Sequence, residues 1–178
     1  TFLLEPPEME GHWDPHVWGD PGLWIECVAL IAEGLIKSDP DGQTTYDKGK
    51  NDYTEKLKSL KVWGVKNVNK IPSNNRYLIT SHDAFNYFGK AFGFQVVGVQ
   101  GISTVAEAPL ADIIHIVDFI KSKKIPAIFV ESSVSPATIK RISQDSGARI
   151  GGELFSDALG TNGELNTFDA LQYDLGTY

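Results

Sequence analysis

The chain has 178 residues, of which 42% are hydrophobic and 22% charged, the composition of a globular protein about one domain in size. Its 16 basic and 23 acidic side chains give a net charge of -7, which disfavours nucleic acids and anionic membranes as partners. The single cysteine, Cys27, excludes both an internal disulfide and a thiolate-rich zinc site.

The first elements are expected to be two helices. Residues 1–19 are rich in proline, glycine and acids and predict irregular structure. An Asp-Pro pair then supplies an N-cap and a first-turn proline, and apolar residues at helical spacing predict a helix over 21–37. A second helical pattern over 40–71 would span about 48 Å if it were continuous. Gly49 and Gly64 weaken the expectation of continuity.

After residue 75, short apolar runs alternate with amphipathic segments. Strands are expected at 76–80, 94–99, 126–130 and 148–152, and helices at 83–93, 109–123 and 136–146. This alternation predicts an α/β fold, with a parallel sheet of about four strands and helices on both of its faces. From residue 160 onward the sequence is polar and glycine-rich and predicts no clear element.

Polar side chains follow several of the predicted strands, where parallel sheets commonly bind ligands. His82 follows the first strand, Glu131 the third and Asp157 the fourth. His16 lies on a loop between two Asp-Pro pairs and joins them if its loop reaches the same edge of the sheet. Two imidazoles and a carboxylate suit a borderline cation such as zinc. Each residue also has a purely structural interpretation, as a helix cap, a turn cap or an acceptor for backbone amides.

The remaining chemistry-bearing residues give weaker signals. His12 is expected to be solvated, and His115 to pack within its helix. A GxSxG elbow, a P-loop and a GxGxxG fingerprint are all missing from the sequence, so enzymatic interpretations have little support.

Four motifs in order, DPHVWGDP, SHDAFNYFGKAFGFQVVGVQGIS, IFVESSVSPATI and GGELFSDALG, resemble the zinc/manganese-type solute-binding proteins of bacterial metal-ion ABC transporters. The resemblance covers roughly residues 12–160. It implies two α/β lobes joined by a long helix, with a metal ion held between the lobes by four side chains. His16, His82 and Asp157 match three of those ligands, and Glu131 matches a supporting residue. A histidine at the position of His82 implies zinc, with manganese as the alternative.

The resemblance also implies a domain organisation: an N-terminal loop and first helix over 1–38, a long linker helix over 39–72 and a C-terminal α/β lobe over 73–178. The N-terminal lobe, with its first histidine ligand, has no counterpart, so we expect a truncated chain. The implied function is extracytoplasmic, periplasmic or cell-surface anchored: binding Zn²⁺ and delivering it to a membrane permease, without catalysis. The alternatives are a structural or interaction domain without useful metal binding and, with less support, a zinc-dependent hydrolase.

Overall fold

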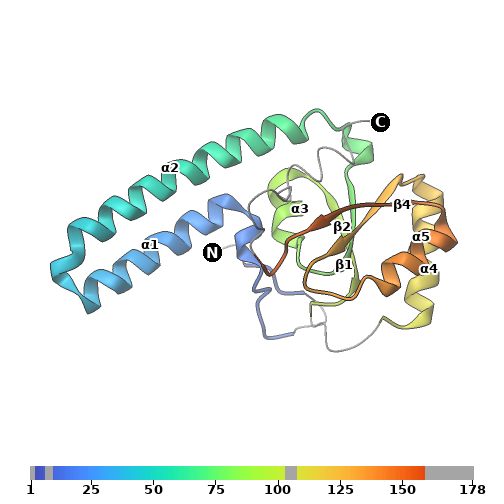
Figure 1. The fold of residues 1–178 in the computed structure, drawn as a ribbon, viewed down its shortest axis with the longest axis horizontal. Coiled ribbons are helices and arrows are strands. Elements are labelled where there is room, and N and C mark those ends of the chain that lie inside the picture. Colours follow the sequence, from blue (N-terminus) through green and yellow to red (C-terminus); the bar gives the residue numbers. More distant parts are fainter. Residues whose placement is uncertain (1–2, 7–9, 103–107, 159–178) are drawn as a thin grey trace.

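The computed structural model describes residues 3–6, 10–102 and 108–158, so the predicted tail from residue 160 lies outside the described part (Figure 1). A helical hairpin extends from one side of an α/β layer. Its first helix, α1 (Pro21–Ser38), begins as predicted, because the Asp20 carboxylate accepts the Gly22 N–H at 2.8 Å and a proline occupies the first turn.

The second helix of the hairpin, α2 (Gln43–Val68), follows a single 3-10 turn and runs back along α1. The predicted helical region over 40–71 is therefore one continuous α-helix of 26 residues, about 39 Å long, with short turns at its ends. Gly49 and Gly64 do not interrupt it. Among the described residues, no helix is sufficiently long and apolar to cross a bilayer.

Within the described residues, four parallel strands form the layer: β1 (Tyr77–His82) pairs with β2 (Gln95–Gln100), and β3 (Ala127–Glu131) pairs with β4 (Arg149–Leu154). Each begins one residue later than expected and ends one or two residues later. β1 lies beside β3, which gives the order β2-β1-β3-β4. The expected single sheet is thus two hydrogen-bonded pairs side by side. At the junction between β1 and β3, the His82 N–H donates to the side chain of Glu131. In a continuous sheet, it would donate to a main-chain carbonyl of the neighbouring strand.

Helices cover both faces of the layer, as predicted. α3 (Asn86–Phe92) packs on one face, and α4 (Leu110–Lys123) and α5 (Ala137–Ser146) pack on the other (Figure 1). Leu78 and Phe129 contribute to the core beneath α3, whereas Ile79 and Ile128, their chain neighbours, contribute to the core beneath α4 and α5. This alternation explains why successive residues of β1 and β3 are buried on both faces of the layer, and it confirms the α/β class.

α3 is shorter than the predicted helix over 83–93. Its N-terminal boundary moves because residues 83–85 form the turn that leaves β1, where the Ala84 N–H donates to the His82 carbonyl at 3.1 Å. Its C-terminal end is the predicted one, with Gly93 in the left-handed conformation at φ 76°. The short turn places His82 at the carboxyl edge of the layer, directly before a buried helix.

Candidate metal centre

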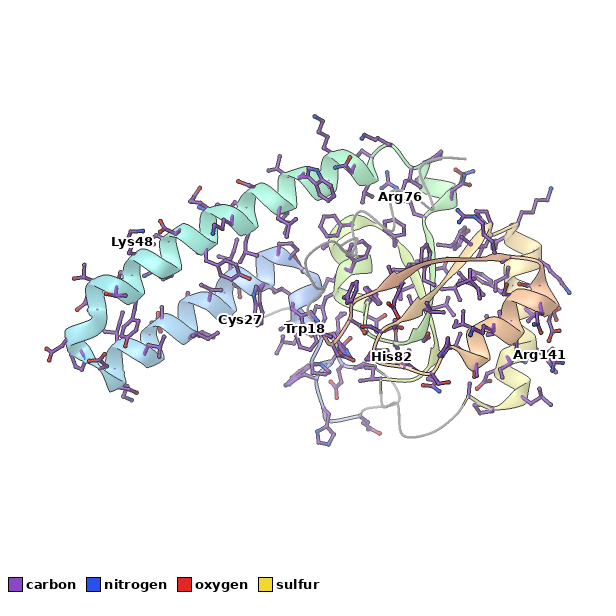
Figure 2. All side chains as sticks on the ribbon, viewed as in Figure 1. Trp18, Cys27, Lys48, Arg76, His82 and Arg141 are labelled. Carbon is purple, nitrogen blue, oxygen red and sulfur yellow. The ribbon has the colours of Figure 1, made fainter. Side chains whose placement is uncertain are left out.

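His16, His82 and Asp157 meet at one point. A ligand atom from each of these three lies within 4.8 Å of the other two. The Nε2 atom of His16 is 3.5 Å from Oδ1 of Asp157, and the Nε2 atom of His82 is 3.3 Å from Oδ2 of the same carboxylate. The two imidazole rings lie edge to face with centroids 5.5 Å apart. The structure therefore brings together all three predicted site residues at the carboxyl edge of the strands, where Figure 2 shows His82.

The first imidazole is held by the loop over residues 13–20, which we call the DPH loop. The Oδ1 atom of Asp14 lies 2.7 Å from Nδ1 of His16 and also accepts the His16 main-chain N–H at 2.9 Å. Helix α3 secures this loop, since the Tyr87 hydroxyl donates to the Asp14 carbonyl and accepts the Leu4 N–H, both at 3.0 Å. The imidazole is consequently held by a buried carboxylate whose own main chain is anchored to α3.

Asp14 is almost fully buried, with 1% of its surface exposed. Burial alone would raise the pKa of this carboxyl, but hydrogen bonds from the His16 ring and amide outweigh burial and lower the pKa of Asp14. Sequence reasoning missed this partner of His16. The signal was available, because an aspartate side chain commonly accepts the main-chain N–H two residues further along.

The second imidazole has an equivalent carboxylate partner on β3. The Oε2 atom of Glu131 lies 2.6 Å from Nδ1 of His82, and its Oε1 atom accepts the His82 N–H at 2.8 Å. Both side chains are buried. Burial opposes the charged imidazolium, but the hydrogen bond and charge of Glu131, aided by the charge of Asp157, raise the pKa of His82. Glu131 thus contacts the back of one imidazole and is not part of the three-residue cluster, which fits its predicted supporting role.

These contacts fix which nitrogen of each ring faces the cluster. The Nδ1 atom of each ring lies 2.6 or 2.7 Å from a buried carboxylate oxygen, so the Nε2 atom is the one that faces Asp157. In the tautomer with its proton on Nδ1, each ring offers an Nε2 lone pair at this point. Lone pairs and a carboxylate repel one another unless a cation lies between them. Two neutral imidazoles and one carboxylate oxygen are a donor set that suits Zn²⁺ with one coordination position left open. The arrangement can therefore bind a divalent cation.

The cluster is closed on one side and open on the other. Both imidazoles are buried, whereas the Asp157 side chain is 37% exposed. A pocket of about 640 Å³ opens beside Asp157, lined mainly by aromatic and aliphatic side chains of α1, α2 and the end of β4. Asp157 is therefore the member of the cluster that faces solvent.

The other two histidines lie outside the cluster. His12 is exposed, as expected. The prediction that His115 packs within its helix is wrong: its side chain is exposed on α4, because Ile116, Val117 and Ile120 occupy the buried face of that helix. The two exposed histidines are useful controls for the two buried ones.

The fold is that of α/β metal solute-binding proteins. The solved structure of the periplasmic zinc binding protein TroA from Treponema pallidum matches with a TM-score of 0.88 and 34% identity, and the match covers 98% of this chain and 65% of that one. The fold class deduced above and the solved structure thus agree over almost the whole chain.

The chain belongs to the ZnuA family, the periplasmic zinc-uptake complex component A, whose family model matches residues 4–175. The resemblance seen in the four motifs is thereby confirmed. Among curated relatives, the manganese-binding lipoprotein MntA of Bacillus subtilis (strain 168) is 40% identical over 163 residues, 88% of this chain and 53% of MntA. The zinc-binding protein TroA of Treponema pallidum (strain Nichols) is 39% identical over 159 residues, 86% of this chain and 52% of TroA. The chain spans about half the length of these relatives.

Proposed function

We propose that this chain is the metal-binding C-terminal part of an extracytoplasmic solute-binding protein, which binds Zn²⁺ and presents it to the permease of an ABC transporter. The observation that carries this proposal is the convergence of His16, His82 and Asp157 on one point, with a carboxylate behind each imidazole. The names of the relatives, which include zinc-binding, manganese-binding and ABC transporter substrate-binding lipoproteins, support the same function. The metal is cargo that must be released.

The donor set favours Zn²⁺ over Mn²⁺. Imidazole nitrogen suits zinc, whereas manganese prefers a larger share of oxygen ligands. Manganese remains the alternative cargo, and relatives named for either metal are consistent with this choice. Binding and release break no covalent bond, so we propose no catalytic activity.

We further propose the domain organisation implied by the resemblance. Residues 1–38 carry the DPH loop, residues 39–72 form the linker and residues 73–178 form the C-terminal lobe. The fourth metal ligand would then come from the half of the relatives' length that this chain does not span. With three ligands and an open position, the chain should bind zinc more weakly than a protein with all four.

Calorimetric titration of the 178-residue chain with zinc chloride and with manganese chloride tests the proposal. We expect one equivalent of zinc to bind with higher affinity than manganese. His16→Ala, His82→Ala and Asp157→Ala should each weaken zinc binding at least about tenfold, since even partners outside the ligand set cost this much when removed. His12→Ala and His115→Ala are matched controls on exposed histidines and should leave the affinity unchanged.

Two outcomes would support the alternatives. Purified protein that contains only a small fraction of an equivalent of metal, and gives no heat on titration, would indicate a structural or interaction domain. Turnover of an activated ester that a chelator abolishes would indicate a zinc-dependent hydrolase. Equal zinc affinity in the buried and exposed histidine variants would contradict the assigned ligands.

A further inference from the structure

The ligand that needs positioning is Asp157. Both imidazoles have a buried carboxylate behind them, but Asp157 lies three residues beyond the end of β4 and its side chain is 37% exposed. The Ser132 N–H donates to the Leu154 carbonyl at 3.0 Å and closes the end of the strand pair. The carboxylate must therefore be positioned by contacts made after the ladder ends.

One such contact comes from the DPH loop itself. The indole Nε1–H of Trp18 donates to the carbonyl of Ser156 at 2.7 Å. Trp18 is two residues from one ligand, His16, and Ser156 directly precedes another, Asp157. The bond thus joins two segments of the cluster that are 138 residues apart in sequence.

Neighbouring side chains hold both partners of this hydrogen bond, Trp18 and Ser156, in place. The Trp18 ring lies edge to face with the His16 ring, with centroids 5.3 Å apart, so its orientation is tied to that of the imidazole. Ser156 is 5% exposed. Its hydroxyl lies 3.2 Å from that of Ser133, which donates to Oδ2 of Asp157 at 3.4 Å. The main chain before Asp157 is thus held by the indole, and the carboxylate is contacted by Ser133.

We propose that Trp18 is a positioning residue for metal binding: its indole N–H holds the Ser156 carbonyl and thereby fixes the Asp157 carboxylate opposite the two imidazoles. This inference rests on the proposed metal-binding function. It assigns Trp18 a role that acts through Asp157, whereas Asp14 and Glu131 act through the imidazoles. Removing the indole N–H should allow the end of β4 to move and should weaken metal binding without unfolding the protein.

The test compares two tryptophans that each donate an indole hydrogen bond. Trp18→Phe removes the bond to Ser156. Trp24→Phe removes the bond from Trp24 Nε1 to the Tyr53 hydroxyl, which is 3.3 Å long and lies within the helical hairpin. By analogy with other groups that orient metal ligands, we expect about a tenfold loss of zinc affinity for Trp18→Phe. We expect less than about a twofold change for Trp24→Phe, because its bond touches no ligand segment.

A second variant separates the N–H from the ring. Incorporation of β-(3-benzothienyl)alanine at position 18 replaces the N–H by sulfur and keeps a bicyclic ring of nearly the same shape. The contact with His16 is then retained while the donor to Ser156 is lost. This variant should show the same loss of zinc affinity as Trp18→Phe. Wild-type affinity would overturn the role of the indole N–H.

A double-mutant cycle with Asp157→Asn distinguishes an effect of Trp18 that acts through Asp157 from a general structural defect. If Trp18 acts through Asp157, then Trp18→Phe should have little further effect on zinc affinity in the Asp157→Asn background. An undiminished loss in that background would overturn the proposal. Failure of the wild-type chain to bind zinc would instead refute the proposed function. The two failures are therefore distinguishable in one set of titrations.

Discussion

Replacing Glu131 by glutamine should reverse the tautomer of His82 and weaken zinc binding. In the native site, one oxygen of Glu131 accepts the main-chain N–H of His82 at 2.8 Å, and the other lies 2.6 Å from Nδ1 of the ring. Glutamine keeps the shape but has only one acceptor oxygen. If that oxygen accepts the main-chain N–H, the amide NH₂ faces Nδ1 and favours the ring with its proton on Nε2, which cannot bind metal through that atom.

The magnitude follows from the two possible orientations of the amide. To bind zinc through Nε2, His82 must carry its proton on Nδ1. The glutamine NH₂ then faces another donor in either orientation of the amide: the Nδ1–H of the ring or the main-chain N–H of His82. An unsatisfied buried donor costs about 1–3 kcal/mol. That corresponds to a loss of zinc affinity of roughly 5- to 150-fold.

Two measurements check this prediction. Calorimetric titration gives the zinc affinity, and two-dimensional NMR of the imidazole ¹⁵N nuclei reports which ring nitrogen of His82 carries the proton. Glu153→Gln is the matched control, because it makes the same chemical change at an exposed position on β4. Zinc binding within about twofold of the wild type, with Nδ1 of His82 still protonated, would refute the reasoning about the tautomer.

Three further predictions test the site and the packing around it. Zinc affinity should fall between about pH 7.5 and about pH 5.5 in titrations, because only a neutral imidazole binds metal. The raised pKa of His82 means that protons begin to compete with zinc at a higher pH than they would for a free histidine. Equal affinities at the two pH values would contradict histidine ligation. Thermal unfolding should show that Gly98→Ala lowers the free energy of unfolding by about 1–3 kcal/mol, since its Cβ would lie 2.6 Å from the backbone nitrogen of Asp83. Gly49→Ala, which has open space on α2, should raise the free energy of unfolding by about 0.5–1 kcal/mol. An equal response of the two variants would refute the packing argument. Tyr87→Phe removes the hydroxyl that joins α3 to the DPH loop and should weaken zinc binding about fivefold, with unchanged affinity as the contrary result.

The strands were predictable because their apolar runs are short and separated by amphipathic helices. The errors lie at their ends, and β1 shows why. Its apolar pattern stops near Thr80, but the strand continues through Ser81 and His82, which are polar and buried. Buried polar residues look like loop residues in a hydrophobicity pattern. The functional end of a strand is therefore the part that such a pattern assigns least well.

The site was predictable to different depths. His82 and Asp157 follow from the rule that ligands gather at the carboxyl ends of parallel strands, and the stiff Asp-Pro loop draws attention to His16. The same rule predicts that His82 and Asp157 lie at one edge, with His16 joining them if its loop reaches it, and the resemblance to a family implied that all three bind one metal ion. The bond between Trp18 and Ser156 had no signal in the sequence, because it is made by tertiary packing between segments 138 residues apart. Contacts that position a ligand from a distant segment therefore need coordinates.

Under the proposed function, the distribution of burial around the cluster predicts how a cargo metal would be bound and released. Asp14 and Glu131 are buried and orient the two imidazoles before any cation arrives, so this half of the site loses little conformational entropy on binding. Asp157 is the exposed member and lies at the end of a strand, where a small movement of the main chain changes its distance from both Nε2 atoms. A binding protein that must also give up its metal needs one ligand that can move while the others stay fixed. The geometry assigns that part to Asp157. Substitutions of Asp14 or Glu131, which orient the imidazoles, should therefore lower the equilibrium affinity for metal. Substitutions that free the end of β4 should chiefly increase the rate of metal dissociation.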